Sequence, residues 1–426
     1  MNDPRAPVSG VVADAAFALA AGPWTDERIA RHLAPLFSRH RAALAGRIYL
    51  ANHSLGRPLD ATADDVAEGM SAWYEAMGDA WDAWEGEEQA HRRRLAALLG
   101  AARPDAVVPK TSAGQGLRAV LGTFDRPPRV VSTQGEFDSL DVILREWARR
   151  GRLELSQVAP RPPVAGADDA SALPRYAVDD IVAAVTPGTD LVVASEVMFQ
   201  TGERLADLAL LCAHAHACGA KVLVDVYHSL AVVPVDVSAT DVDFAVGGSY
   251  KYLRGGPGAC FLYVAPRWLD AGLRTLDTGW FAKDRRFDYQ RPDPPAFARG
   301  GDGWLESTPP VLSAFQARAG QELVLALGVA ALREDSLARQ RRLVETLASQ
   351  GIRAIGGDDT RGAFVVVPID GPDGAAPRVA DALAQRGVIA DARGAWLRLC
   401  PDPLTSAHDM TRAATALAAV LAGDRA

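Results

Sequence analysis

The sequence has few cysteines and no long apolar run, and each shortage excludes a class of protein. Four cysteines among 426 residues do not make a disulfide framework. No apolar stretch approaches the roughly 20 residues that a membrane-spanning helix needs. The apolar segment 11–21 is preceded by both Asp3 and Arg5, so the positive region of a secretory signal is missing. We therefore expect a cytoplasmic protein that does not bind a membrane.

Positive charge is not concentrated in any part of the chain either. The formal net charge is −8, whereas nucleic-acid-binding proteins usually carry a basic stripe. The short arginine runs 92–94 and 149–150 are interpreted as solvated helix faces. With 49% hydrophobic and 23% charged residues, the composition is that of a globular protein with two or more domains. No nucleic-acid partner is expected.

Two cysteines and two histidines lie close together at positions 212–218 and raise the question of a metal site. On a helix each residue turns by about 100°, so Cys212 and His216 share one face while His214 and Cys218 point the other way. One ion could not bind all four side chains. We therefore predict structural positions for them and no metal.

Short apolar runs that alternate with helical segments fill the middle of the chain. The runs lie at 106–109, 129–132, 191–195, 222–225, 243–247 and 260–264. This alternation predicts βαβ units and an α/β fold with a mainly parallel sheet between helices. Helical patterns cover 63–99 and 205–218, and the Pro-rich segment 160–174 predicts a surface loop.

The pattern changes after an irregular, Pro-rich stretch at 291–310. It then predicts a long helical region over 312–350, strands at 363–368 and 396–400, and a helix over 377–386. We predict an N-terminal segment (1–62) that contributes to the small domain and to a dimer. A large domain (63–300) and a small C-terminal domain (301–426) would follow it.

The run 222–225 ends in an acid, Asp225, and ligands of open α/β sheets bind at the carboxyl ends of the strands. A buried acid is costly unless it meets a cation or a hydrogen-bond donor. The protonated nitrogen of a pyridine ring is such a partner. A turn or helix-capping aspartate gives the same pattern.

Lys251 follows the next run, 243–247, and stands between Tyr250 and Tyr252 just before the glycine-rich turn 255–258. Aromatic neighbours and close backbone would partly desolvate its amine. Desolvation lowers the pKa of a lysine and frees the amine to form an imine. A lone loop lysine is usually solvated, but one placed 26 positions after a strand-end acid is a more specific signal.

Thr111 and Ser112 lie upstream, where the run 106–109 passes into a helical segment. Hydroxyl groups and backbone N–H groups at such a junction can hold a phosphate, although an ordinary N-cap gives the same pattern. The order of a Walker loop is absent. Phosphate cradle, strand-end acid and amine occur in that order along the chain. Together they predict pyridoxal phosphate, held as a Schiff base on Lys251.

Several motifs resemble kynureninase and, more broadly, the class V aminotransferase group of fold-type I pyridoxal-phosphate enzymes. They are Val-Asp-Val-Tyr-His-Ser (224–229), Ser-Tyr-Lys-Tyr-Leu (249–253), Gly-Gly-Pro-Gly (255–258), Asn-His-Ser-Leu-Gly (52–56), Gly-Trp-Phe (279–281), Ser-Thr-Pro-Pro (307–310) and Leu-Arg-Leu-Cys-Pro-Asp-Pro-Leu (397–404). The resemblance spans about residues 49–408, and the motif at 249–253 is the most specific. It implies the fold-type I architecture, with a large sheet of the seven-stranded type and a smaller C-terminal α/β domain.

The resemblance also implies which residues hold the phosphate of the cofactor. Thr111 and Ser112 would bind it at the strand-to-helix junction, and Tyr250 and Trp280 would reach it as well. Thr308 would reach the phosphate of the neighbouring subunit. A homodimer with active sites at the subunit interface follows from that last role.

Five further roles around the pyridine ring follow from the same resemblance. Phe137 would stack on the ring, and Ser195 and His228 would line the cofactor. Asp225 would meet the ring nitrogen, and Lys251 would carry the cofactor and remove the Cα proton of the substrate. Asp225 and Lys251 are thus the predicted catalytic residues.

The substrate, an α-amino acid, would be bound by two residues of other motifs. Arg398 would hold its α-carboxylate, a task that suits the planar fork of an arginine, and Ser54 would lie in the same site. Without the resemblance, Arg398 would be interpreted as an ordinary surface arginine of a small-domain strand.

Three positions depart from the family pattern. Phe137 is followed by Asp138-Ser139-Leu140 where the family has Pro, Ser or Thr, and Asp, so Asp138 and Asp141 are the candidates to replace the missing acid. Lys283 stands where the family has a histidine. Asp79 stands near the position of a histidine that helps to read the aromatic part of kynurenine.

The resemblance implies hydrolytic Cβ–Cγ cleavage, which converts kynurenine to anthranilate and alanine in tryptophan catabolism, or the same reaction on a related substrate. Transamination and β-elimination by a carbon–sulfur lyase share the first steps and remain alternatives. Cysteine desulfuration is disfavoured because it needs a nucleophilic cysteine on a mobile loop, and all four cysteines lie in helical or strand-like runs. A non-catalytic regulator of the same fold is disfavoured by the missing basic region.

Overall fold

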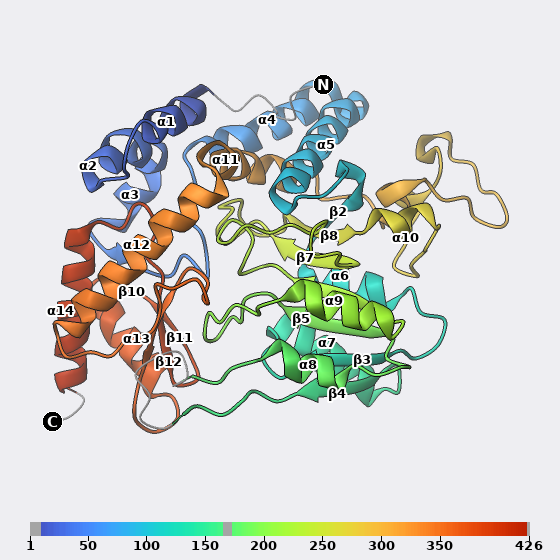
Figure 1. Cartoon of the computed structure of the whole chain (residues 1–426). Coiled ribbons are helices and arrows are strands. Elements are labelled where there is room, and N and C mark those ends of the chain that lie inside the picture. The colour runs from blue at the N-terminus through green and yellow to red at the C-terminus, as the bar shows by residue number, and fades with distance from the viewer. Residues whose placement is uncertain (1–9, 165–172, 424–426) are drawn as a thin grey trace.

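The computed structural model describes residues 10–164 and 173–423, and a seven-stranded sheet lies at the centre of this part of the chain (Figure 1). The strand order is β2-β8-β7-β6-β5-β3-β4. The strands are β2 (Val107–Lys110), β3 (Arg129–Thr133), β4 (Glu154–Val158), β5 (Leu191–Ser195), β6 (Lys221–Asp225), β7 (Phe244–Gly248) and β8 (Cys260–Val264). From β7 to β4 neighbouring strands are parallel, whereas β8 is antiparallel to both β7 and β2. The predicted α/β fold with a mainly parallel sheet is confirmed.

Helices cover both faces of the sheet, which is why its central strands are apolar along their whole length. Every residue of β5, β7 and β8 is buried. The covering helices are α6 (Ala113–Leu121), α7 (Asp138–Arg149), α8 (Val178–Ala184), α9 (Leu208–Ala217) and α10 (Pro266–Asp270). In Figure 1, α8 and α9 cross the near face of the sheet. The edge strand β4 was not predicted, because it is only half-buried and lacks an apolar run.

A second, smaller sheet lies toward the C-terminus and has its own hydrophobic core. It has the order β11-β12-β9 and consists of β9 (Val365–Pro368), β11 (Asp391–Arg393) and β12 (Trp396–Leu399). Around it lie α12 (Val329–Ala348), α13 (Ala375–Gln385) and α14 (Ala407–Gly423), drawn in orange and red in Figure 1. Beside it, β1 (Ile48–Tyr49) pairs in parallel with β10 (Val388–Ile389), so an N-terminal strand joins the C-terminal unit.

The remaining helices connect the two units. The N-terminal helices are α1 (Gly10–Ala20), α2 (Asp26–Arg28) and α3 (Ser38–Leu44), and α1 packs on α11 (Leu312–Leu327). In turn, α11 packs on α4 (Ala61–Ala76) and α5 (Ala80–Leu99), and α5 also packs on β2 of the large sheet. The proposed domain boundaries at residues 62 and 300 remain predictions. The predicted loop 160–174 falls partly outside the described residues.

Two long helical predictions are interrupted in the structure. The pattern over 63–99 is split by a short 3-10 turn at Met77–Asp79, and the region 312–350 is split at Gly328. Gly328 has φ +80°, a conformation that favours glycine and ends a helix. Among the described residues, none of these helices is both long enough and apolar enough to cross a bilayer.

The interpretation of Arg92–Arg94 as a solvated helix face is wrong for Arg92 and Arg94, whereas Arg93 is exposed as predicted. Arg92 is 1% exposed and donates from Nε to the carbonyl of Val107 at 2.8 Å, while Arg94 pairs with Glu87. These side chains are buried because α5 lies between the large sheet and α11. The second run, 149–150, is exposed and pairs with a glutamate of its own helix, as predicted.

The cysteines and histidines of α9 point to different partners, as the helical spacing predicted. His216 bonds through Nε2 to Asp243 Oδ2 at 2.9 Å, and Cys212 is buried on the same side of the helix. His214 and Cys218 contact each other at 3.7 Å on the other side.

Candidate functional site

A cavity lies beyond the carboxyl ends of the parallel strands, the place where open α/β sheets bind ligands. It is bordered by the ends of β5 and β6, by the first turns of α6 and α7 and by the segment after β7. Eight of the residues predicted from the sequence line it: Thr111, Ser112, Phe137, Ser195, Asp225, His228, Tyr250 and Lys251. Segments at the ends of five different strands of the large sheet, β2, β3, β5, β6 and β7, thus meet at one place.

Lys251 is buried, with 5% of its surface exposed, in the turn that follows β7. Its Nζ lies 2.5 Å from Nε2 of His228 and 5.3 Å from the ring centre of Phe137. Burial lowers the pKa of Lys251 to about 7; the charge of Asp225 opposes this shift and that of Arg398 adds to it. A large share of this amine is therefore neutral at neutral pH, which is the form that attacks a carbonyl.

Asp225 ends β6 and is also 5% exposed. The backbone N–H of Tyr227 donates to its Oδ1 at 2.7 Å. Burial raises the pKa of Asp225 to about 6, although this N–H and the charge of Lys251 lower it. A protonated heteroaromatic nitrogen in the cavity would stabilise the ionised carboxylate, so the acid fits a pyridine-type cofactor.

The junction of β2 and α6 forms the other end of the cavity. Ser112 caps the helix, since its hydroxyl accepts from the N–H of Gln115 at 3.1 Å. Gly116 lets α6 approach the sheet closely, because a Cβ there would lie 2.6 Å from Val246 Cγ1. The N-terminus of α6 and the hydroxyls of Thr111 and Ser112 therefore border the cavity, an arrangement suited to an anion.

The N-terminal segment holds the lysine turn in place. The N–H of Gly56 donates to the carbonyl of Tyr250 at 2.8 Å. A Cβ at Gly56 would lie only 1.8 Å from the carbonyl oxygen of Lys251. The family-like glycine is thus required by a close backbone approach.

Arg398 and Ser54, the predicted substrate ligands, lie together at the edge of the site. Arg398 is 2% exposed and donates from Nε and Nη2 to the two carboxylate oxygens of Asp391, at 2.8 and 2.7 Å. Asp391 also accepts from the hydroxyl of Ser54 and lies 2.7 Å from Nε2 of His53. Arg398 Nη1 donates to the carbonyl of Phe199, and Phe199 lines the cavity.

This cluster is electrostatically well balanced. Burial alone would raise the pKa of Asp391, but His53 and Arg398 hold it far below its usual range. Burial lowers the pKa of His53 to about 4, so this imidazole is neutral at neutral pH. Asp391 holds Nε and Nη2 of the Arg398 guanidinium, and the carbonyl of Phe199 holds Nη1. Sequence reasoning missed Asp391.

The structure does not bring Trp280 and Thr308 to the cavity within one chain. Trp280 Nε1 donates to Thr308 Oγ1 at 3.1 Å, and Thr308 borders a neighbouring cavity that shares Thr111 with the main one. Their contact with a phosphate across a subunit interface remains a prediction. Lys283 lies beside Trp280 and Asp79 is exposed, so neither lines the main cavity.

Neither candidate for the missing family acid points into the site. Asp138 is exposed, and Asp141 accepts from Gln157 at 2.8 Å and pairs with Arg145. Instead, Glu136 is buried against the cavity wall, where it bonds the hydroxyl of Ser195 at 2.6 Å. Its position at the carboxyl end of β3 was a signal that the sequence offered and that sequence reasoning missed.

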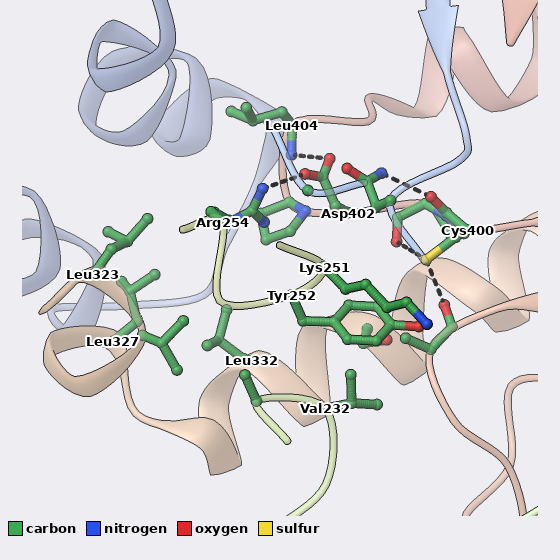
Figure 2. Close-up of a pocket in the computed structure, with 18 of the residues that line it drawn as sticks. Val232, Lys251, Tyr252, Arg254, Leu323, Leu327, Leu332, Cys400, Asp402 and Leu404 are labelled. Atoms are coloured by element: carbon green, nitrogen blue, oxygen red, sulfur yellow. Dashed lines mark hydrogen bonds and ion pairs between the residues drawn. The ribbon is translucent and has the colours of Figure 1, made fainter. Parts of the chain in front are cut away.

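A second cavity, of about 680 Å³, lies behind the lysine turn (Figure 2). Leucines of α11 and α12, among them Leu323 and Leu332, face the side chains of Lys251 and Tyr252 across it. Asp402 accepts from Arg254 at 3.2 Å in this view and also pairs with Arg57 at 3.4 Å. Asp402 therefore ties the N-terminal segment, the lysine turn and the C-terminal unit together.

Comparison with known proteins agrees with this geometry. The family model of class V aminotransferases matches residues 75–417. A kynureninase from Salinispora tropica is 33% identical over 399 residues, which cover 88% of this chain and 90% of that protein. A kynureninase from Pseudomonas fluorescens is 30% identical over 377 residues, 85% of each chain.

Solved structures show the same fold. The cystine C–S lyase C-DES, in a variant with glycine covalently linked to its PLP cofactor, has a TM-score of 0.77 at 18% identity and covers 89% of this chain and 98% of its own. A cysteine desulfurase from Thermococcus onnurineus NA1 has a TM-score of 0.72 at 18% identity, with 88% and 95% coverage. With the family model matching most of its length, the chain belongs to the class V aminotransferase family, whose members have the fold-type I architecture and use pyridoxal phosphate.

Proposed function

We propose that this enzyme cleaves the Cβ–Cγ bond of an α-amino acid by hydrolysis, with kynurenine or a close relative as the substrate. The observation that carries the proposal is the convergence of the Lys251 amine and the Asp225 carboxylate on one cavity that ends at the first turn of α6. Kynureninase relatives at 30–33% identity over most of the chain support the reaction type. A cytoplasmic homodimer that acts in tryptophan catabolism is part of the same proposal.

The residues of this chain divide the binding of the cofactor among them. Lys251 would carry it covalently, Asp225 would hold a proton on the ring nitrogen, and Phe137 would pack on the ring. Thr111 and Ser112 would bind the phosphate at the N-terminus of α6. When bound, the cofactor supplies an electron-withdrawing ring that stabilises negative charge at Cα of the substrate.

Two groups would act on the substrate itself. The Arg398 guanidinium would bind the α-carboxylate through the N–H groups that Asp391 does not occupy, and so orient the Cα–H bond. The Lys251 amine would then take the Cα proton, because its lowered pKa of about 7 suits a base at neutral pH. The pKa of His228 is lowered by burial, and its Nε2 lies 2.5 Å from that amine.

The attachment site can be tested by borohydride reduction of the holoenzyme and peptide mapping. The sequence contains four lysines, at 110, 221, 251 and 283, so the experiment has three internal alternatives. Lys110 is the most informative of the three other lysines because, like Lys251, it is buried and its pKa is lowered by burial. Label on Lys251 alone is expected, and label on any other lysine would overturn the assignment.

The reaction can be tested with a panel of amino acids. Anthranilate and alanine released from kynurenine would support hydrolysis. Pyridoxamine phosphate that accumulates with an amino acid would instead indicate transamination, and sulfide or pyruvate from cysteine or cystine a carbon–sulfur lyase. Desulfuration through a cysteine nucleophile is disfavoured, because Cys212, Cys260 and Cys400 are buried and burial raises the pKa of each thiol.

A further inference from the structure

The second cavity, behind the lysine turn, has no part in the function proposed above. Its walls come from the N-terminal segment, α11, α12, the lysine turn and the residues that follow β12. Most of the walls are apolar. Leu33 and Phe37 line the cavity from the N-terminal segment, and Figure 2 shows Leu323, Leu327 and Leu332 along another side. An apolar space thus borders the lysine turn on the side away from the main cavity.

One end of this cavity is polar. Asp402 is 6% exposed and pairs with both Arg254 and Arg57, so a single carboxylate serves two guanidinium groups. Arg254 uses only Nη1 for this pair, and among the described residues its Nε and Nη2 have no hydrogen-bond partner. The guanidinium carbon of Arg254 lies 5.4 Å from the ring centre of Phe37, another residue of the cavity wall. Two N–H-bearing nitrogens of an arginine therefore remain available for an anion in the cavity.

The backbone of Arg254 points to a task for this side chain. Arg254 has φ +57°, a left-handed conformation that favours glycine or asparagine and is strained for an arginine. It lies three positions after Lys251, and its N–H donates to the carbonyl of Lys251 at 3.1 Å. Strain of this kind is typical of residues that bind ligands.

Asn52 adds a second buried polar group to the same end of the cavity. It is 3% exposed, and its Nδ2 donates to the carbonyl of Cys400, two residues before Asp402, at 2.9 Å. Its Oδ1 has no partner, although a buried acceptor without one is costly. A ligand that satisfies this end would present a carboxylate to Arg254 and an N–H or O–H donor to Asn52. The donor would be neutral, because a cation would be repelled by the two guanidinium groups.

We propose that the second cavity binds a small apolar carboxylate that carries a neutral hydrogen-bond donor next to its carboxylate. The carboxylate would bind Nε and Nη2 of Arg254 as a two-pronged pair, and the donor would bind Oδ1 of Asn52. The apolar body would pack on the leucines of α11 and α12. Anthranilate has this composition: an aromatic ring with an amino group beside its carboxylate. The choice of anthranilate rests on the proposed function, of which it is a product, whereas the site itself does not.

The ligand chemistry is tested by calorimetric titration of the holoenzyme with three matched probes. Anthranilate has all three features, benzoate lacks the donor, and aniline lacks the carboxylate. Aniline should bind at least about tenfold more weakly than anthranilate, because it loses a charge-assisted hydrogen bond, and benzoate should lie between them. Equal binding of aniline and anthranilate would overturn the proposal.

Two variants test the location. Arg254→Asn removes the guanidinium and suits the backbone, because asparagine adopts positive φ more readily. Leu332→Phe fills the cavity from α12. Each should weaken anthranilate binding about tenfold or more, and neither residue lines the main cavity. The matched control is Arg285→Asn, the same substitution at another arginine with positive φ, 44°, whose side chain is 73% exposed. This control should bind anthranilate as the wild type does.

The outcomes separate this site from the reaction. If the wild type does not bind anthranilate, or if Arg254→Asn and Leu332→Phe both bind it as tightly as the wild type, the inference is overturned. If Arg254→Asn does not fold, Leu332→Phe decides. Release of anthranilate from kynurenine is measured separately. Its absence would overturn the proposed function, whereas release without binding in the second cavity would overturn only the site.

Discussion

Replacement of Asp391 by asparagine tests whether the Arg398 cluster is a buried electrostatic unit. Asp391 accepts bonds from Ser54 and twice from Arg398 and lies against His53, and the side chain of Arg398 is 3% exposed. Asparagine keeps the size but removes the charge and turns one acceptor into a donor. Breaking one partner of a buried ion pair costs about 3–5 kcal/mol, because the remaining charge is left uncompensated. We expect Asp391→Asn to lose that much unfolding free energy.

The measurement is urea unfolding of the cofactor-free protein at pH 7, with Asp180→Asn as the control. Arg161 binds Asp180 through the same two-pronged geometry, at 2.7 and 2.9 Å, but the two side chains are 48% and 35% exposed. That pair is screened by water, so its loss should leave the unfolding midpoint unchanged. Equal effects of the two substitutions would refute the reasoning.

The difference in unfolding free energy between the wild type and Asp391→Asn should also depend on pH, which gives a second check. The folded pKa of Asp391 is depressed, so its contribution is present above the unfolded pKa of 3.8 and is lost as pH falls toward the folded value. The gap between wild type and Asp391→Asn should therefore hold from pH 7 to about 4 and shrink only below that.

Three further predictions follow from the structure. The rate at which the apoprotein takes up pyridoxal phosphate should rise with pH up to about 7 and then level off, because burial lowers the pKa of Lys251 and the neutral amine is the reactive form. Stopped-flow absorbance would measure this rate, and a continued rise to pH 10 would contradict the prediction. Gly56→Ala should abolish cofactor binding, as measured by cofactor titration, since the new Cβ would meet the Lys251 carbonyl. Gly86→Ala, in open space on α5, should instead stabilise the fold by about 0.5–1 kcal/mol, as measured by calorimetry. His91 is buried and its pKa is lowered to about 3, so the free energy of unfolding of the wild type should fall as pH falls below 6.5. In His91→Gln this decrease between pH 6.5 and 4 should be smaller by up to about 3 kcal/mol, as measured by denaturant unfolding.

The large sheet could be predicted because its central strands are buried on both faces. Six of its seven strands coincide with apolar runs to within about one residue, as with Leu191–Ser195. The missed strand, β4, is an edge strand whose side chains alternate between exposed and half-buried, so no apolar run marks it. The burial of Arg92 and Arg94 could not be predicted either, because α11, the helix that covers them, lies more than 200 residues along the chain.

The candidate site likewise contains residues that a strand end marks in the sequence and residues that only folding brings into place. Lys251 and Asp225 could be assigned because each is tied to a strand end, and the strand ends of a parallel sheet meet at one edge. Asp391 and Glu136 depend instead on what a side chain touches after folding. Asp391 approaches the site from the small sheet through Arg398, and Glu136 does so through the hydroxyl of Ser195 on a neighbouring strand.

The charge balance of the cavity explains why such supporting acids are needed. Arg398 brings a cation to a region from which water is largely excluded, and a positively charged ring nitrogen of the cofactor would add a second. Asp225 and Asp391 each neutralise one of these charges while remaining ionised, because each faces a cation. Asp391 binds Arg398 through Nε and Nη2, so the α-carboxylate of a substrate would bind the same guanidinium through its other N–H groups.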